Sequence, residues 1–189
     1  LHFLTTINFK PMLSKNQFPQ SCLPFLVMAF FFLAYTFVNG QSIVGMAIAK
    51  SNDHVYAWYS NGTVSAGTSA NLSAYRSLYN FSLPPNKSPE DIVGVGIASN
   101  DHVYVWFSDG TVSSGTSWDL NGYRETYHYS LPPGKSPSDI VGMAISSSDH
   151  VYAWYSDGTV SSGTSRDLNS YRETYHYSLP PGKSPRDIA

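Results

Sequence analysis

The chain has 189 residues with a formal net charge of −2, and only 13% of its residues are charged. No stretch is rich in Lys and Arg, so a nucleic-acid partner is not expected. Aromatic residues reach 15%, and Tyr alone occurs 14 times. This bias favours packed β structure and aromatic contact surfaces.

The amino-terminal segment has the layout of a secretory signal. Residues 1–11 form a leader with no expected role, and residues 12–40 form a signal peptide. Its apolar run covers residues 23–38, and cleavage is expected after Gly40. The run is shorter than the roughly 20 residues of a membrane-spanning helix. The alternative is a signal anchor that stays in the membrane. The only cysteine, Cys22, lies in this segment. We therefore expect a secreted chain with no disulfide and no stable membrane span.

The remainder of the chain is built from three copies of one unit. Matching His, Trp and Tyr residues recur 48 residues apart. The copies span residues 41–91, 92–139 and 140–187, and residues 188–189 repeat the start of a unit. The units of such a repeat architecture each bury their apolar faces against their neighbours. We therefore expect a fragment of a larger array, which self-associates where a neighbouring unit is missing.

The second copy shows the first strands expected in every unit. Residues 92–98 are almost wholly apolar, which predicts an inner strand buried on both faces. Alternating side chains predict a hairpin with strands at residues 103–108 and 111–117. Asp109 and Gly110 between them predict a tight type I′ turn.

The end of the second copy predicts one more strand and two turns. Residues 123–131 alternate again, which predicts an outer strand. Pro133 and Gly134 suit the centre of a type II turn. Residues 136–139, with the sequence Ser-Pro-Ser-Asp, have the signature of a helix start, and the short distance to the next strand allows only a single turn of helix.

Four strands and one helical turn in a 48-residue unit are typical of one β-propeller blade, whose repeat is roughly 40–50 residues long. The alternative all-β fold is a β-trefoil, which three similar units would complete, whereas a propeller usually needs at least four blades. The apolar character of the inner strand favours the propeller. We therefore expect three blades that belong to a larger ring.

No sequence pattern indicates catalysis or a cofactor. The chain has no nucleophile elbow, no HExxH, no phosphate-binding glycine loop and no Cys pair for zinc. A repeated Asp-His pair offers metal-ligand types, but an Asx turn at the Asp followed by a strand that starts at the His is the favoured explanation. The pair occurs as Asp53-His54, Asp101-His102 and Asp149-His150. We expect neither an enzyme nor a bound metal or cofactor.

Two repeated aromatic groups are candidate carbohydrate contacts. One is a mid-strand Trp, which can pack between blades or contact a ligand. The other is a Tyr-Arg pair followed, in the second and third copies, by an acid and a further Tyr. Aromatic rings stack on the apolar face of a sugar while Arg and carboxylate groups bond its hydroxyls, although a structural ion pair is the alternative. The candidates are Trp58, Tyr75, Arg76, Trp106, Tyr123, Arg124, Tyr127, Trp154, Tyr171, Arg172 and Tyr175.

Four N-glycosylation sequons cluster in the first copy, at Asn61, Asn71, Asn80 and Asn86. The other two copies carry Asp, His or Gly at these positions. Glycans added in a eukaryotic secretory pathway would cover one blade and shield any ligand site there, and unmodified sequons are the alternative.

The apolar strand at residues 92–98, the Tyr-rich hairpin and the turn with Pro132 and Pro133 together resemble the tachylectin-type propeller lectins. The resemblance covers residues 43–189 and is one of architecture. It implies repeated, weak sugar sites between or on the blades, amplified by multivalency.

These observations predict a secreted, multivalent carbohydrate-binding protein whose partners are glycans or glycoproteins. One alternative is an extracellular protein-binding or structural repeat module. Another is the non-catalytic part of a larger secreted enzyme. A lectin should lose sugar binding on Arg124→Ala and Arg172→Ala while keeping its fold, whereas a structural module would bind no sugar.

Overall fold

The computed structural model describes residues 41–123 and 125–188, which belong to one compact unit, Gln41–Ala189. The predicted leader and signal peptide, with Cys22, lie outside the described residues. Within the described ranges no helix is long and apolar enough to cross a membrane. The described residues form twelve strands and three short 3₁₀ helices, which confirms the predicted all-β class.

The elements in chain order are β1 (Ile43–Ile48), β2 (Val55–Tyr59), β3 (Thr63–Gly67), β4 (Arg76–Asn80), η1 (Pro89–Asp91), β5 (Ile92–Ile97), β6 (Val103–Phe107), β7 (Thr111–Gly115), β8 (Thr126–His128), η2 (Pro137–Asp139), β9 (Ile140–Ile145), β10 (Val151–Tyr155), β11 (Thr159–Gly163), β12 (Arg172–His176) and η3 (Pro185–Asp187).

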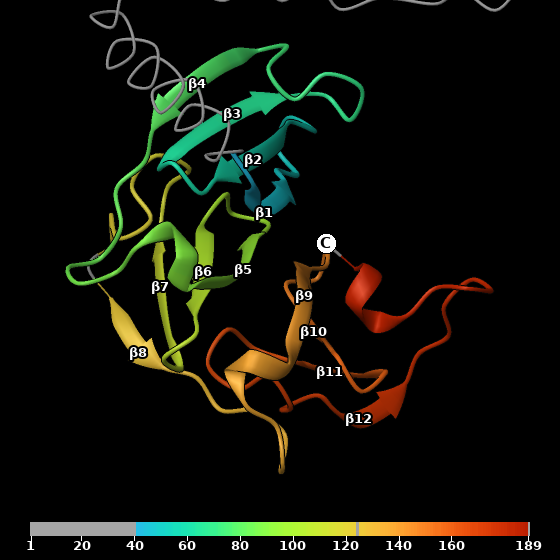
Figure 1. The fold of residues 1–189 in the computed structure, drawn as a ribbon. Coiled ribbons are helices and arrows are strands. Elements are labelled where there is room, and N and C mark those ends of the chain that lie inside the picture. The colour runs from blue at the N-terminus through green and yellow to red at the C-terminus, as the bar shows by residue number, and fades with distance from the viewer. Residues whose placement is uncertain (1–40, 124, 189) are drawn as a thin grey trace, which may run out of the picture. The chain divides into compact units, whose positions relative to one another are not determined.

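The strands pair within three separate four-stranded antiparallel sheets, in the orders β1-β2-β3-β4, β5-β6-β7-β8 and β9-β10-β11-β12. Each repeat is therefore one meander. Strand β1 lies beside β5, and β5 lies beside β9, so the first strands of the three repeats form an inner row (Figure 1). Among the described residues the only β-bridges between sheets are the isolated pairs Ser82–Asp119 and Ser130–Asp167. A trefoil barrel, in contrast, would need strand ladders between units.

The hairpin of each unit is built on the alternation that the sequence shows. In the second sheet Val103 and Val105 are buried on one face. Val105 lies opposite Ser113, and Trp106 lies opposite Val112. Each of these bulky side chains on β6 thus lies opposite a smaller one on β7, and such cross-strand pairs stabilise the sheet.

The turn between β6 and β7 is not the predicted type I′ turn. Gly110 has a φ of 84°, but Asp109 is not among the described residues with positive φ. The Gly110 N–H donates to the carbonyl of Phe107 at 3.0 Å. The Asp109 carboxylate accepts hydrogen bonds from the N–H and hydroxyl of Thr111, at 3.1 and 2.6 Å. The hairpin therefore uses a three-residue loop in which only the glycine adopts the left-handed conformation.

The two turns predicted after the outer strand are confirmed. Gly134 has a φ of 79°, and the Lys135 N–H donates to the carbonyl of Pro132 at 3.1 Å, as in a type II turn. The Ser136 N–H and hydroxyl donate to the Asp139 carboxylate at 2.8 and 2.7 Å and cap η2. The linker between sheets is thus rigidly shaped by local hydrogen bonds.

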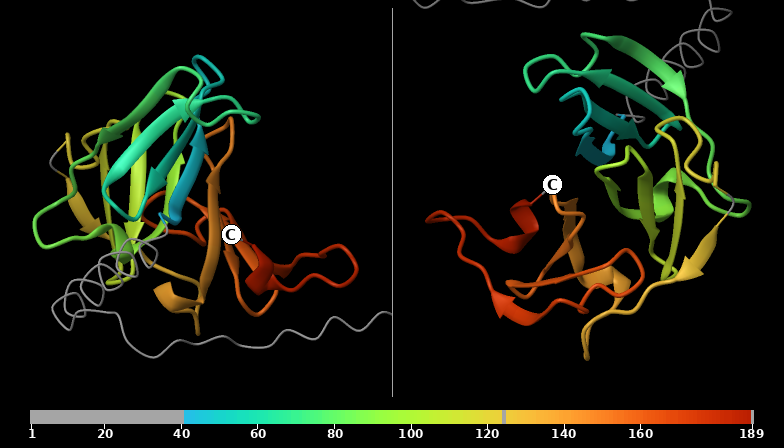
Figure 2. Two further views of the ribbon diagram at one scale, coloured as in Figure 1. Left: turned by 45° about the horizontal axis from the view of Figure 1, so that its top comes forward. Right: turned by 180° about the vertical axis from the view of Figure 1, so that it is seen from behind.

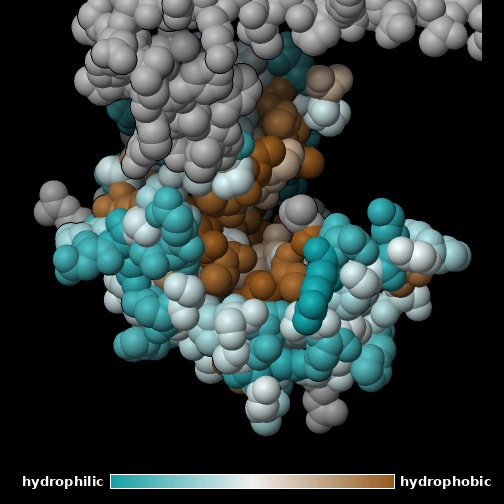
Figure 3. All heavy atoms as spheres, viewed as in Figure 1, coloured by the Kyte–Doolittle hydropathy of each residue, from teal (hydrophilic) through white to brown (hydrophobic). Residues whose placement is uncertain are grey.

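Apolar side chains between consecutive sheets form two cores, and the inner strands carry much of the apolar surface (Figure 3). The first core lies between the first and second sheets, and the second core lies between the second and third. Buried members of the first core include Trp58, Val64, Val95, Val105, Phe107 and Leu120. Buried members of the second core include Trp106, Val112, Tyr129, Val151, Tyr155 and Leu168.

Glycines on the inner strands let neighbouring sheets approach. A Cβ added to Gly94 would lie 2.6 Å from the sulfur of Met143, and one added to Gly96 would lie 2.6 Å from Ile145. The sheets fan out from this inner row, as the two views in Figure 2 show. The glycines predicted to allow close approach therefore do so, by receiving the side chains of the next sheet.

Candidate functional site

Trp58 and Trp106 lie inside the contacts between sheets. Both side chains are 0% exposed. The indole N–H of Trp58 donates to the carbonyl of Ser117, and that of Trp106 donates to the carbonyl of Ser165, each at 3.0 Å. The prediction that these two residues contact sugar is wrong, because neither indole presents a face to solvent.

A groove of 590 Å³ opens between the second and third sheets beside Trp106. We call it the Arg166 groove. It brings together Tyr123 and Tyr127, which the sequence had predicted as one site. The residues that line it are Asn100, His102, Tyr104, Ser114, Tyr123, Glu125, Tyr127, Thr164, Ser165 and Arg166.

The chemistry of this groove centres on Tyr127, Glu125 and Arg166. The guanidinium carbon of Arg166 lies 3.9 Å from the centroid of the Tyr127 ring. A nitrogen of Arg166 lies 3.7 Å from a carboxylate oxygen of Glu125, and both side chains are 63% exposed. Such an exposed pair contributes little to stability. The arrangement nevertheless places the planar Arg166 guanidinium, the Glu125 carboxylate and the Tyr127 ring side by side.

Tyr104 and Tyr127 form the inner wall of the Arg166 groove. The Tyr127 hydroxyl lies 3.3 Å from the hydroxyl of Ser165 on the next sheet. Burial raises the pKa of Tyr104, and the neighbouring Tyr127 raises it further. The Tyr104 phenol therefore stays neutral at physiological pH and keeps a proton to donate.

A contact between a His ring and a Tyr ring occurs at the same place in every unit. The ring of His102 lies 4.3 Å from that of Tyr123, and equivalent contacts join His54 to Tyr75 at 4.1 Å and His150 to Tyr171 at 4.3 Å. The histidine thus holds an exposed tyrosine in place. This pairing was not predicted from the sequence, although both residues recur every 48 positions.

The turn before each of these histidines differs in detail from the prediction. Asp101 has a φ of 64°, and the side chain that accepts from the His102 N–H is that of Asn100, at 3.2 Å. The Asx turn therefore belongs to Asn100 and not to Asp101. In the part of the chain that the structure describes, no three His, Cys, Asp or Glu side chains gather as a metal site would require.

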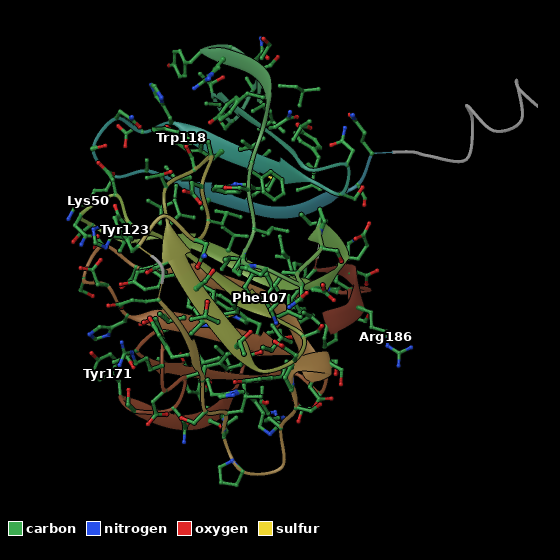
Figure 4. The ribbon with its side chains drawn as sticks, turned by 90° about the vertical axis from the view of Figure 1, so that its left-hand side faces the viewer. Lys50, Phe107, Trp118, Tyr123, Tyr171 and Arg186 are labelled. Carbon is green, nitrogen blue, oxygen red and sulfur yellow. The ribbon has the colours of Figure 1, made fainter. Side chains whose placement is uncertain are left out.

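A second groove, of 240 Å³, lies between the first and second sheets, and we call it the Trp118 groove. Trp118 is 55% exposed, and Tyr123 lines this groove as well as the Arg166 groove. On the first sheet the Arg76 guanidinium stacks at 3.8 Å over Tyr79, whose hydroxyl lies 3.3 Å from Ser117. Figure 4 shows Trp118 and Tyr123 on one side of the unit and Arg186 on the other.

The remaining predicted residues fall in different surroundings. Arg124 and the side chain of Arg172 lie outside what the structure describes. Trp154 and Tyr175 are partly buried on the third sheet. Tyr171 is 53% exposed beside its histidine.

Sequence reasoning missed Arg166 and Trp118 because it followed the residues that repeat. These two occupy the same position of the repeat, and the first unit has Ala70 there. The signal that could have found them is a change from Ala to Trp to Arg within an otherwise constant Thr-Ser-x-Asx-Leu segment. A variable residue on a constant framework is the pattern of a specificity position.

The four sequon asparagines, Asn61, Asn71, Asn80 and Asn86, are all exposed. The side-chain oxygens of Asn61 and Asn71 accept hydrogen bonds from the sequon hydroxyls of Thr63 and Ser73, at 2.7 and 3.2 Å. Their surface positions are therefore compatible with modification.

An apolar cavity of 430 Å³ lies along the inner strands. Aliphatic residues make up its wall, including Ile48, Val95 and Ile145, with Ser69 as a polar exception. It offers few groups that could orient a polar ligand, so the two grooves between sheets are the better candidate sites.

No protein-family model matches the chain, and no curated protein matches it. The solved structures that resemble part of it include two proteins. One is a catalytically inactive variant of virginiamycin B lyase from Staphylococcus aureus with quinupristin, at 13% identity and a TM-score of 0.40, covering 76% of this chain and 42% of that one. The other is a protein of unknown function from Bacteroides caccae, at 12% identity and a TM-score of 0.42, covering 74% of this chain and 47% of that one. The chain thus spans less than half the length of either protein, and neither similarity assigns an activity to it.

Proposed function

We propose that the three sheets are blades of a β-propeller. Each repeat is a four-stranded meander, and its first strand lies in the inner row. Several contacts between sheets recur at equivalent positions, as the two Trp-to-Ser hydrogen bonds of 3.0 Å illustrate. Constant contacts between successive units are the basis of repeat architectures.

We infer further that the chain is a carbohydrate-binding protein. The observation that carries this proposal is the Arg166 groove, where the Tyr127 ring, the Arg166 guanidinium and the Glu125 carboxylate lie side by side. A sugar presents an apolar CH face to an aromatic ring and hydroxyls to both donors and acceptors. The protonated Tyr104 phenol adds a further donor on the same wall.

Binding without catalysis fits the groove best. Glu125 is the one carboxylate among the described residues that line it, whereas glycoside hydrolysis usually uses a pair of carboxylates on either side of the bond. We therefore propose a non-enzymatic protein that needs no cofactor. A groove occurs at each of the two described boundaries between sheets, so weak individual sites would act together through multivalency. Glycans and glycoproteins outside the cell are the partners that such a secreted protein would meet.

A glycan array tests this function. The full chain, expressed for secretion and checked for fold by circular dichroism, should bind a related set of glycans, and the free sugar should compete. Arg166→Ala should weaken binding at this groove about 10- to 100-fold, the loss expected when a charged hydrogen-bond donor is removed. Arg186→Ala is the matched control, because Arg186 is exposed on the opposite side of the unit. A folded chain that binds no glycan would contradict the proposal and favour a protein-binding module.

A further inference from the structure

The third sheet has a face equivalent to the one that the first two sheets use for contact, and no described sheet covers it. Trp154 occupies the repeat position of Trp58 and Trp106, but it is only partly buried, whereas the other two are 0% exposed. No described atom accepts a hydrogen bond from its indole N–H, although both counterparts donate to a serine carbonyl on the next sheet. We call this side of the third sheet the exit face.

Ser178 extends the exit face at the outer end of the third sheet. Its counterparts Ser82 and Ser130 donate their N–H groups to the carbonyls of Trp118 and Arg166, at 2.9 and 2.8 Å. Each also accepts a hydrogen bond at its carbonyl, Ser82 from the Leu120 N–H and Ser130 from the Leu168 N–H, both at 3.0 Å. Ser178 is exposed, and no described residue completes this pair of bonds for it.

The first sheet has the complementary side, which we call the entry face. Met46 and Ile48 on this face are 46% and 61% exposed, whereas their counterparts Val95 and Ile97 in the second sheet are 2% and 7% exposed. Leu72 is partly exposed, while Leu120 and Leu168 at the same repeat position are fully buried. The entry face therefore exposes aliphatic groups whose counterparts in the second sheet are buried against the preceding sheet.

We propose that the exit face of one chain docks on the entry face of a second copy, head to tail. The indole N–H of Trp154 would donate to the carbonyl of Ser69, as Trp58 does to Ser117. The Ser178 N–H and carbonyl would bond the carbonyl of Ala70 and the N–H of Leu72. This contact continues an interface that the chain already forms twice, with the same donors and acceptors at the same repeat positions.

The inner strands fit the same arrangement. Gly45 and Ala47 of the first sheet face Val95 and Ile97 of the second. Gly142 and Ala144 hold the corresponding positions on the exit face, where they would receive Met46 and Ile48 of the second copy. Ile188 now lies 3.2 Å from the position of a Cβ on Gly142, so docking of Met46 requires Ile188 to move aside.

A contact between two different faces either closes a ring or continues as a filament. The docking also completes a third groove. The third sheet carries one side of it, formed by Tyr152 and the His150–Tyr171 stack. It lacks the opposite wall, which Thr164 and Ser165 provide in the Arg166 groove. Thr68 and Ser69 of the second copy would supply that wall.

Directed cross-linking tests this contact. The bridges Ser82–Asp119 and Ser130–Asp167 predict that Ser178 of one copy lies opposite Asn71 of the other, at a separation that a disulfide can span. A full-length chain carrying Ser178→Cys should form a disulfide with a second chain carrying Asn71→Cys, both with the only native cysteine removed by Cys22→Ser. A link between two Ser178→Cys chains in place of the mixed pair would overturn the head-to-tail arrangement.

Sedimentation velocity supplies a second measurement on the full chain carrying Asn71→Asp, which removes a sequon from the entry face. We expect a dimer or larger species whose dissociation constant rises at least 10-fold on Trp154→Ala. Trp118→Ala is the matched control, because it removes an exposed Trp from the second sheet and should leave association unchanged. A chain that stays monomeric at every concentration, or that loses association equally in both variants, would refute the proposal.

Discussion

The indole Nε1 of Trp58 donates a hydrogen bond to the carbonyl oxygen of Ser117 at 3.0 Å, across the boundary between the first and second sheets. The two residues are 59 positions apart in the chain, and Trp106 makes the same bond to Ser165. One repeated side chain therefore both fills the core between two sheets and fixes their separation. The groove entrances lie immediately beside these bonds, so the packing of the sheets sets the geometry of the candidate sites.

The stability of the chain should depend on this bond. Trp58→Phe keeps an aromatic ring in the core but leaves the buried Ser117 carbonyl without its donor, which should lower the free energy of unfolding by about 1–3 kcal/mol. Urea denaturation of dilute protein measures the change. Trp154→Phe is the control, since the Trp154 indole has no acceptor among the described residues, and its loss should be much smaller. Equal losses in the two variants would show that the hydrogen bond contributes nothing.

The loop that carries Trp118 should require Gly115. A Cβ at this position would lie 1.9 Å from the carbonyl oxygen of Asp119 and 2.7 Å from the nitrogen of Gly122. Gly115→Ala must therefore displace the loop backbone, and we expect a loss of about 1–3 kcal/mol in the free energy of unfolding. Gly122→Ala is the comparison, because its nearest contact would be 3.2 Å. If Gly115→Ala were no more destabilising than Gly122→Ala, the close approach would not be real.

Acid should weaken the junction between the linker and the third sheet. Lys135 forms an ion pair with Asp157, and its ammonium, with the Thr159 hydroxyl, lowers the pKa of Asp157 from 3.8 to about 2. Because the folded pKa lies below the unfolded one, protonation favours unfolding. This contribution is therefore present above about pH 4 and is lost as the pH falls to 2. The Asp157 side chain is 55% exposed, so solvent keeps the effect small.

Urea denaturation at pH 5 and at pH 2.5 measures this contribution. Asp157→Asn should be less stable than the unmodified chain at pH 5, and the difference between the two should shrink at pH 2.5. A difference that stays constant between the two pH values would rule out a role for the Asp157 charge.

Most of the fold could be predicted from the sequence, because the same pattern of residues occurs in all three units. Alternation over residues 103–107 and the type II turn at Gly134 depend on local conformation alone, and both are confirmed. The hairpin turn was predicted wrongly, because the Asp109 carboxylate bonds Thr111 and stabilises a longer loop. The Asp-Gly dipeptide alone does not show whether the Asp side chain will stabilise a two-residue turn or the three-residue loop.

The site was harder to predict, because exposure depends on the contact between sheets. The sequence places Trp106 and Tyr104 on the same strand but does not say which face the next sheet covers. The structure buries the Trp and leaves the Tyr on the groove wall. Arg166 was missed for a different reason, since it comes from the following unit and reaches the groove only after the sheets have packed.

The two grooves should bind sugar independently. Trp118 offers an aromatic surface at the position where the third sheet offers a guanidinium, so Trp118→Ala should remove one class of site and Arg166→Ala the other. Isothermal titration should show fewer sites per chain in each variant, with the affinity of the remaining sites unchanged. A uniform loss of affinity at all sites in either variant would show that the grooves are coupled.

Glycosylation at Asn71 should control the association of chains. Asp119, at the same repeat position, accepts a hydrogen bond from the Ser82 hydroxyl of the preceding sheet at 2.9 Å. The Asn71 side chain therefore occupies the place where an incoming Ser178 would dock, and a glycan there would fill the entry face. Secreted protein with an occupied Asn71 sequon, verified by mass spectrometry, should sediment as a monomer, whereas Asn71→Asp should associate. Asn80→Gln removes a neighbouring sequon and should leave the protein monomeric, and association of the Asn71-glycosylated chain would contradict the prediction.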